Sequence, residues 1–148
     1  MLSIWNNLGL NKSGVIHVNW DVVVSESDID ELVNLARSLP QNKARLCLHE
    51  TSSSPMQVTY LAFVNPYADK VHKHPVRPEV IIPVRGEAIR QIYSDNFQLI
   101  DEVQMISGRG ESFSMPPNKW HSLEVRSENF VMIEIGLGPF TSDSTINR

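Results

Sequence analysis

Seven short runs rich in β-branched and aromatic residues follow one another at near-regular intervals after residue 44, and this pattern limits the fold more than any other feature. Turn sequences such as SSSP, NPYAD, SDN, SGRG and PPN separate the runs. Such spacing is typical of a sandwich or a barrel, and not of alternating strands and helices. We therefore predict an all-β domain with strands at 45–49, 57–64, 80–84, 88–93, 99–106, 121–125 and 130–135.

One helix is predicted ahead of these strands. Apolar residues recur there at spacings of three and four, namely Ile29, Leu32, Leu35, Ala36 and Leu39. Ser27 and Asp30 resemble a capping box, and Pro40 lies just past the end of the pattern. We expect a helix at about residues 28–39.

Length and charge narrow the class of protein. A chain of 148 residues suits one domain and is long enough to bury a core. The formal charge of −4, the pI of about 5.7 and the absence of a lysine and arginine block argue against nucleic-acid binding. The opening MLSIWNNLGLNKSG lacks a signal-peptide pattern, and no segment approaches the roughly 20 apolar residues of a membrane span. We expect a soluble, cytoplasmic protein.

The single cysteine, Cys47, excludes an internal disulfide framework and fits a reducing compartment. We interpret it as a small buried strand residue within RLCLH, because free cysteine is often buried. The alternative interpretation is a reactive thiol.

Two of the five histidines stand close together in the stretch DKVHKHPVRPEVIIPVRG. His72 and His74 are two residues apart, so on a strand they point the same way. Pro75 and Pro78 then mark a turn, and Glu79 should begin the next strand. A neighbouring strand can bring this carboxylate alongside the two imidazoles.

A third histidine opens another predicted strand. Asn118 lies in the preceding turn, where a left-handed backbone conformation is tolerated. His121, Leu123 and Val125 share one face, and the two apolar residues indicate that this face looks inward. Each histidine alone fits a hydrogen-bonded core residue, but three imidazoles and one carboxylate together favour a divalent transition metal site.

These residues match the two signature motifs of the cupin superfamily, which the chain resembles. The first motif has the spacing of His72, His74, Glu79 and Gly86, and the second that of Gly110, Pro116, Asn118 and His121. The chain departs from the motifs at Pro66, Asn118 and Val125, where Gly, Gly and Asn are usual. The resemblance implies a cupin barrel, a double-stranded β-helix or jelly roll, with the helix packed outside. It also implies one bound metal, Fe, Mn, Ni or Zn, held by His72, His74, Glu79 and His121.

The pattern across residues 25–141 is similar to the WbuC-type cupin-fold metalloproteins, often encoded among polysaccharide or O-antigen synthesis genes. It includes ARLCLH, where that subgroup has approximately Arg-x-Asn-x-His, so Cys47 is a departure. We therefore expect an N-terminal segment at 1–24, the cupin domain at 25–141 and a loose polar tail at 142–148.

We expect a metal-dependent isomerase, epimerase or lyase that acts on a small carbohydrate or sugar-derived acid. The candidate proton-transfer groups are Glu134 and His49, and the candidate substrate-binding groups are Arg45 and Arg90. An iron-dependent dioxygenase and a non-catalytic sugar- or metabolite-binding module are the alternatives. The apolar segment GVIHVNWDVVV, which includes His17, is a candidate edge strand shared in a homodimer.

Overall fold

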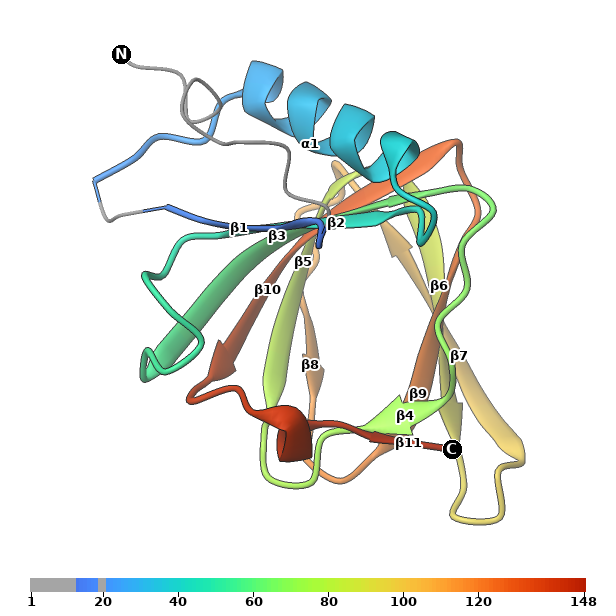
Figure 1. Ribbon diagram of the computed structural model, residues 1–148. Coiled ribbons are helices and arrows are strands. Elements are labelled where there is room, and N and C mark those ends of the chain that lie inside the picture. Colours follow the sequence, from blue (N-terminus) through green and yellow to red (C-terminus); the bar gives the residue numbers. More distant parts are fainter. Residues whose placement is uncertain (1–12, 19–20) are drawn as a thin grey trace.

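The computed structural model describes residues 13–18 and 21–148, which form two facing sheets and one α-helix (Figure 1). The six-stranded sheet has the order β1 (Val15–His17), β2 (Lys43–Cys47), β3 (Met56–Val64), β10 (Asn129–Leu137), β5 (Glu79–Arg85) and β8 (Phe113–Met115). The five-stranded sheet has the order β11 (Ile146–Asn147), β4 (His72–Lys73), β9 (Trp120–Val125), β6 (Glu87–Tyr93) and β7 (Leu99–Ile106). The predicted barrel with one helix is confirmed, and each of the seven predicted strands is present.

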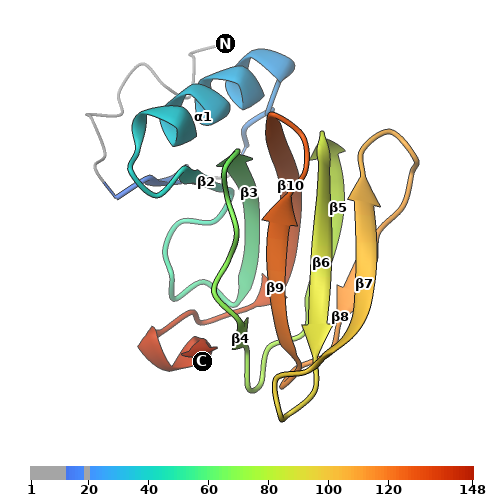
Figure 2. The same ribbon diagram turned by 90° about the vertical axis from the view of Figure 1, so that its right-hand side faces the viewer.

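Helix α1 (Glu26–Ser38) lies on the outer face of the six-stranded sheet, over β2 and β3 (Figure 2). Its N-cap is Ser25, whose amide donates to the Asp28 carboxylate at 2.8 Å while its hydroxyl accepts from the Asp28 amide at 3.4 Å. The predicted capping box at Ser27 is therefore wrong by two residues. The sequence SESDID holds two overlapping boxes, and the earlier one, Ser25 with Asp28, is the one that forms.

Alternation along β3 divides the apolar residues between two clusters. Ala62 and Val64 face the helix and pack with Leu32 and its neighbours, whereas Leu61 and Phe63 face the interior of the barrel. The interior cluster fills one end of the barrel with buried side chains from both sheets: Leu61, Phe63, Ile81, Ala88, Met105, Leu123, Val125, Phe130 and Met132. The other end is left for polar side chains.

Both ends of the described chain add strands that the sequence pattern did not predict in this form. The segment proposed as a shared edge strand contributes β1, which pairs in parallel with β2 of the same chain. The tail, expected to be loose, forms a 3-10 turn at Ser142–Ser144 and then β11, which pairs with β4. Residues 1–12 and 19–20 of the predicted N-terminal segment at 1–24 lie outside the described residues. No helix among the described residues is long and apolar enough to span a membrane.

Gly86 closes the tight turn between β5 and β6 with a φ of +76°, and an added Cβ would collide with the carbonyl oxygen of Asn129. We expect Gly86→Ala to lower the free energy of unfolding by at least about 2 kcal/mol, because left-handed backbone strain adds to a main-chain clash. Urea unfolding measures this loss. Gly108→Ala is the matched control, since Gly108 has a φ of +80° with open space around it. It should cost only about 1 kcal/mol, and equal losses in the two variants would contradict the clash.

Candidate metal centre

Three histidines from adjacent segments of the five-stranded sheet converge inside the barrel. His72 on β4 is the register partner of His121 on β9, and His74 follows β4 directly. One ligand atom from each residue lies within 4.8 Å of the others. The predicted inward face of β9 is confirmed, since His121, Leu123 and Val125 are all buried.

Main-chain carbonyl groups orient all three imidazole rings. The ring Nδ1 atoms lie near the carbonyl oxygens of Lys70 for His72 at 2.7 Å, Ser144 for His74 at 2.9 Å and Lys119 for His121 at 2.7 Å. A ring that donates its Nδ1 proton to a carbonyl keeps an unprotonated Nε2, which is the form that binds a metal ion. The turn that carries Lys119 depends on Asn118, whose φ of +63° confirms the predicted left-handed conformation.

Glu79 reaches the histidines from the opposite sheet. It is the first residue of β5, as predicted, but β5 belongs to the six-stranded sheet, so the carboxylate crosses the interior instead of coming from a neighbouring strand. Its Oε1 lies 3.0 Å from Nε2 of His74, and its Oε2 lies 3.5 Å from Nη2 of Arg90. Burial opposes ionisation of Glu79, but His74 and Arg90 outweigh it and lower the pKa of Glu79 to about 2.

A divalent ion fits this donor set on two observations. Nε2 of His121 is buried and has no hydrogen-bond partner among the described residues, and such an atom is costly unless it binds something. Oε1 of Glu79 is also buried, and its contact is the ion pair with Nε2 of His74. Burial, together with Arg90, lowers the pKa of His121 to about 3, so its ring is neutral near pH 7. His72 and His121 therefore offer neutral rings, and Glu79 offers an anionic oxygen. His74, whose pKa Glu79 raises, would release its proton when an ion binds.

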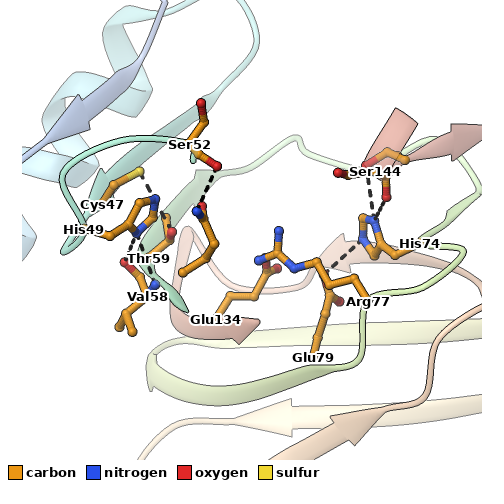
Figure 3. A network of polar contacts seen from close by, with 12 residues as sticks. Cys47, His49, Ser52, Val58, Thr59, His74, Arg77, Glu79, Glu134 and Ser144 are labelled. Atoms are coloured by element: carbon orange, nitrogen blue, oxygen red, sulfur yellow. Dashed lines mark hydrogen bonds and ion pairs between the residues drawn. The ribbon is translucent and has the colours of Figure 1, made fainter. Parts of the chain in front are cut away.

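The histidines line a cavity of about 510 Å³ that also takes in most of the charged side chains of the interior. Arg77 donates to Glu134 at 3.4 Å, and Figure 3 shows this pair between the Glu79 and His74 contact and the side chains of Cys47 and His49. Burial raises the pKa of Glu134, and the negative charge of Glu79 raises it further. The side chain of Glu134, one of the two candidate proton-transfer groups, is 19% exposed, and its carboxylate is paired with Arg77.

The other predicted site residues, Arg90, Arg45 and His49, lie in two parts of the cavity. Arg90 is buried beside Glu79, and Arg45 and His49 line the same cavity toward β2. Sequence reasoning missed Arg77, which lies within the HKHPVRPE stretch and is 7% exposed. Its position between two prolines near the ligands was the only available signal.

No protein-family model matches the chain, and no curated protein does. Solved structures do match it: CapF with the inhibitor 3-isopropenyl-tropolone has a TM-score of 0.64 at 15% identity, over 87% of this chain and 42% of CapF. Oxalate oxidase in complex with the substrate analogue glycolate has a TM-score of 0.57 at 17% identity, over 74% of this chain and 57% of that one. A cupin superfamily protein from Desulfitobacterium hafniense has a TM-score of 0.54 at 14% identity, over 72% and 86% of the two chains.

The chain adopts the cupin fold. These similarities have low sequence identities and are evidence for the architecture alone. The chain spans about half the length of CapF and oxalate oxidase, the larger proteins that it matches. Within the cupin barrel, the three histidines form a group able to hold a metal ion.

Proposed function

We propose that this cupin is a metal-dependent enzyme of the isomerase, epimerase or lyase type, and that its substrate is a small carbohydrate or sugar-derived acid. The observation that carries the proposal is the meeting of two kinds of group in one cavity. Three imidazole rings stand beside a buried carboxylate and buried guanidinium groups. A cavity of about 510 Å³ lies within the range of small-ligand sites.

We propose His72, His74, His121 and Glu79 as the ligands of one divalent transition metal. Such an ion would polarise a carbonyl or hydroxyl oxygen of the substrate. Nε2 of His74 and Oε1 of Glu79 now lie 3.0 Å apart, and both would serve as donors to the ion. Arg90 keeps the Glu79 carboxylate ionised and in place.

Buried guanidinium groups support an anionic substrate. Nε and Nη1 of Arg90 and Nε of Arg77 are buried and have no hydrogen-bond partner among the described residues. A carboxylate is the ligand that guanidinium donors in such a site satisfy best, because it accepts two parallel hydrogen bonds. Arg45, on the wall toward β2, can hold a hydroxyl group farther along the substrate.

Glu134 is the proposed proton-transfer group. Its raised pKa brings the carboxylate closer to the range in which a general base is effective. Through Arg77 it lies on the side of the cavity toward Glu79. His49, the other candidate, has its Nδ1 engaged by the main chain of Val58 and lies on the far side.

The ligands named for two structural neighbours agree with this substrate class. Glycolate, bound by oxalate oxidase, is a 2-hydroxy acid, and the tropolone bound by CapF also carries two adjacent oxygens. We propose by analogy that the present chain takes a ligand with two vicinal oxygens. Membership of the WbuC-type subgroup, a place in polysaccharide biosynthesis, a cytoplasmic location and a homodimer joined through the outer edge of β1 belong to the same proposal.

Solvent exchange provides the test. Candidate 2-hydroxy acids, sugar acids and ketoses are incubated with the metal-loaded protein in D₂O, and the hydrogen next to the carbonyl or carboxyl carbon is followed by NMR. Exchange or elimination supports the proposal. Oxygen consumption without exchange would favour the dioxygenase alternative, and metal-dependent binding without any turnover would favour the binding module.

With an active substrate in hand, Glu134→Gln should lower kcat by about 10²- to 10⁴-fold, because the amide cannot accept the proton. Metal content should not change, since Glu134 is not a proposed ligand. Glu128→Gln on the exposed surface is the matched control and should leave kcat unchanged. A Glu134→Gln variant with full kcat would assign the proton transfer to another group.

A further inference from the structure

A second group of metal-binding side chains lies in the same barrel, outside the centre described above. A ring nitrogen of His17, a ring nitrogen of His49 and Sγ of Cys47 lie within 4.8 Å of one another. We propose that these three residues form a separate site for a thiophilic divalent cation of the zinc class. This inference does not rest on the proposed function.

Strand pairing brings the three donors together. β1 runs parallel to β2 with His17 opposite Cys47, so their side chains project from the same face of the sheet. His49 follows Cys47 by two residues and therefore returns to that face. The rings of His17 and His49 stand nearly perpendicular, with centroids 5.3 Å apart. Donors around a tetrahedral zinc ion are about 3.3–3.8 Å apart, given bonds of about 2.0–2.3 Å, so a small inward movement closes the site.

Main-chain carbonyl groups orient the rings of His17 and His49, as they orient the three rings of the first site. Nδ1 of His17 lies 3.0 Å from the carbonyl oxygen of His49, and Nδ1 of His49 lies 3.1 Å from the carbonyl oxygen of Val58. Donation of the Nδ1 proton to these oxygens leaves each Nε2 free to bind an ion. The Val58 amide lies equally close to Nδ1 of His49, at 3.1 Å, so metal binding would select one tautomer of that ring.

Cys47 supplies the donor that separates this site from the first. Its side chain is buried, and the Thr59 hydroxyl donates to its Sγ over 3.9 Å. Burial raises the pKa of the thiol, so the metal-free residue is neutral and unreactive. An arriving cation would bind the sulfur as thiolate and release its proton to solvent.

The ion would keep an open position. Three protein donors leave a fourth place in a tetrahedral shell, the arrangement of zinc sites that bind water or substrate. All three residues line the cavity that also contains His72, His74 and His121. Figure 3 places Cys47 and His49 on one side of the Glu134 and Arg77 pair and His74 on the other, so the two ions would lie at separate ends of one chamber.

Cobalt titration of untagged, metal-free protein tests the site, because thiolate ligands give Co²⁺ a strong near-ultraviolet charge-transfer band that nitrogen and oxygen ligands do not. Wild-type protein should bind two Co²⁺ per chain and develop the band, and Zn²⁺ should abolish it. Cys47→Ser should lose the band and keep one Co²⁺. His121→Ala should keep the band and lose the other Co²⁺.

His17→Ala provides a second test in case the Cys47→Ser protein does not fold, because His17 is exposed and its replacement should leave the fold intact. It should weaken the cobalt affinity read from the band at least about tenfold. Absence of the band in wild-type protein at saturating Co²⁺ would overturn the proposal. So would a band that persists in Cys47→Ser, or an unchanged affinity in His17→Ala.

Discussion

Replacing His121 with alanine should remove one equivalent of transition metal per chain. His121 contributes a buried Nε2 that has no hydrogen-bond partner among the described residues, and its ring lies within 4.4 Å of the His72 ring and 5.4 Å of the His74 ring, centroid to centroid. Loss of one of the proposed ligands should weaken binding on the order of 100-fold, or about 2.7 kcal/mol. Elemental analysis after exhaustive dialysis measures the change, and the Cys47→Ser background keeps the second proposed site out of the count.

Lys119→Ala is the matched control for this experiment. Only the main-chain carbonyl of Lys119 contacts the His121 ring, at 2.7 Å, so removal of its side chain should leave the metal content unchanged. If the His121→Ala protein retained its full equivalent of metal, His121 would not be a ligand. Equal losses in both variants would point to a general disturbance of the turn.

Metal-free protein should lose stability steeply on mild acidification. Burial holds the pKa of His121 at about 3, against 6.5 in the unfolded chain, so unfolding takes up a proton as the pH falls below 6.5. The free energy of unfolding should therefore drop by about 2 kcal/mol between pH 6.5 and pH 4.5 on account of His121 alone. Urea unfolding at several pH values in the presence of a chelator measures the slope.

Other titratable groups of the cavity also change the free energy of unfolding with pH. His72 and His49 also have pKa values lowered by burial and add to the loss. His74 acts oppositely: burial opposes its protonation, but Glu79 raises its pKa, so its contribution changes only above pH 6.5. Glu79 stabilises the fold until the pH falls below 4.5. The His121→Gln variant should lose less stability between pH 6.5 and pH 4.5, by the amount expected for His121. If its free energy of unfolding fell as steeply with pH as that of wild type, the pKa of His121 would not be lowered in the folded protein.

The grouping of His72, His74 and His121 could be predicted from the sequence, whereas most of the charged residues around them could not. The three histidines were found because strand periodicity and motif spacing constrain side chains that lie within a few residues of a turn. Asn118 was predicted in its left-handed conformation for the same local reason. The carboxylate of Glu79 was correctly placed at the start of a strand, but the sheet to which that strand belongs depends on long-range pairing that no local pattern encodes.

Contacts between distant segments account for what was missed. The association of His17 with Cys47 and His49 depends on a parallel pairing across thirty residues, for which a single histidine in an apolar run gives no signal. Cys47 was correctly expected to be buried. The pairing of Arg77 with Glu134 likewise joins two segments far apart in the chain.

The carbonyl of Ser144 fixes the ring of His74 from a stretch whose composition marks it as dispensable. Hydrogen exchange of the amide groups at 145–148 should therefore respond when the proposed ion binds at His74. Deleting the C-terminal residues from Ser144 onward, or adding an affinity tag after them, would therefore disturb the orientation of the His74 ring.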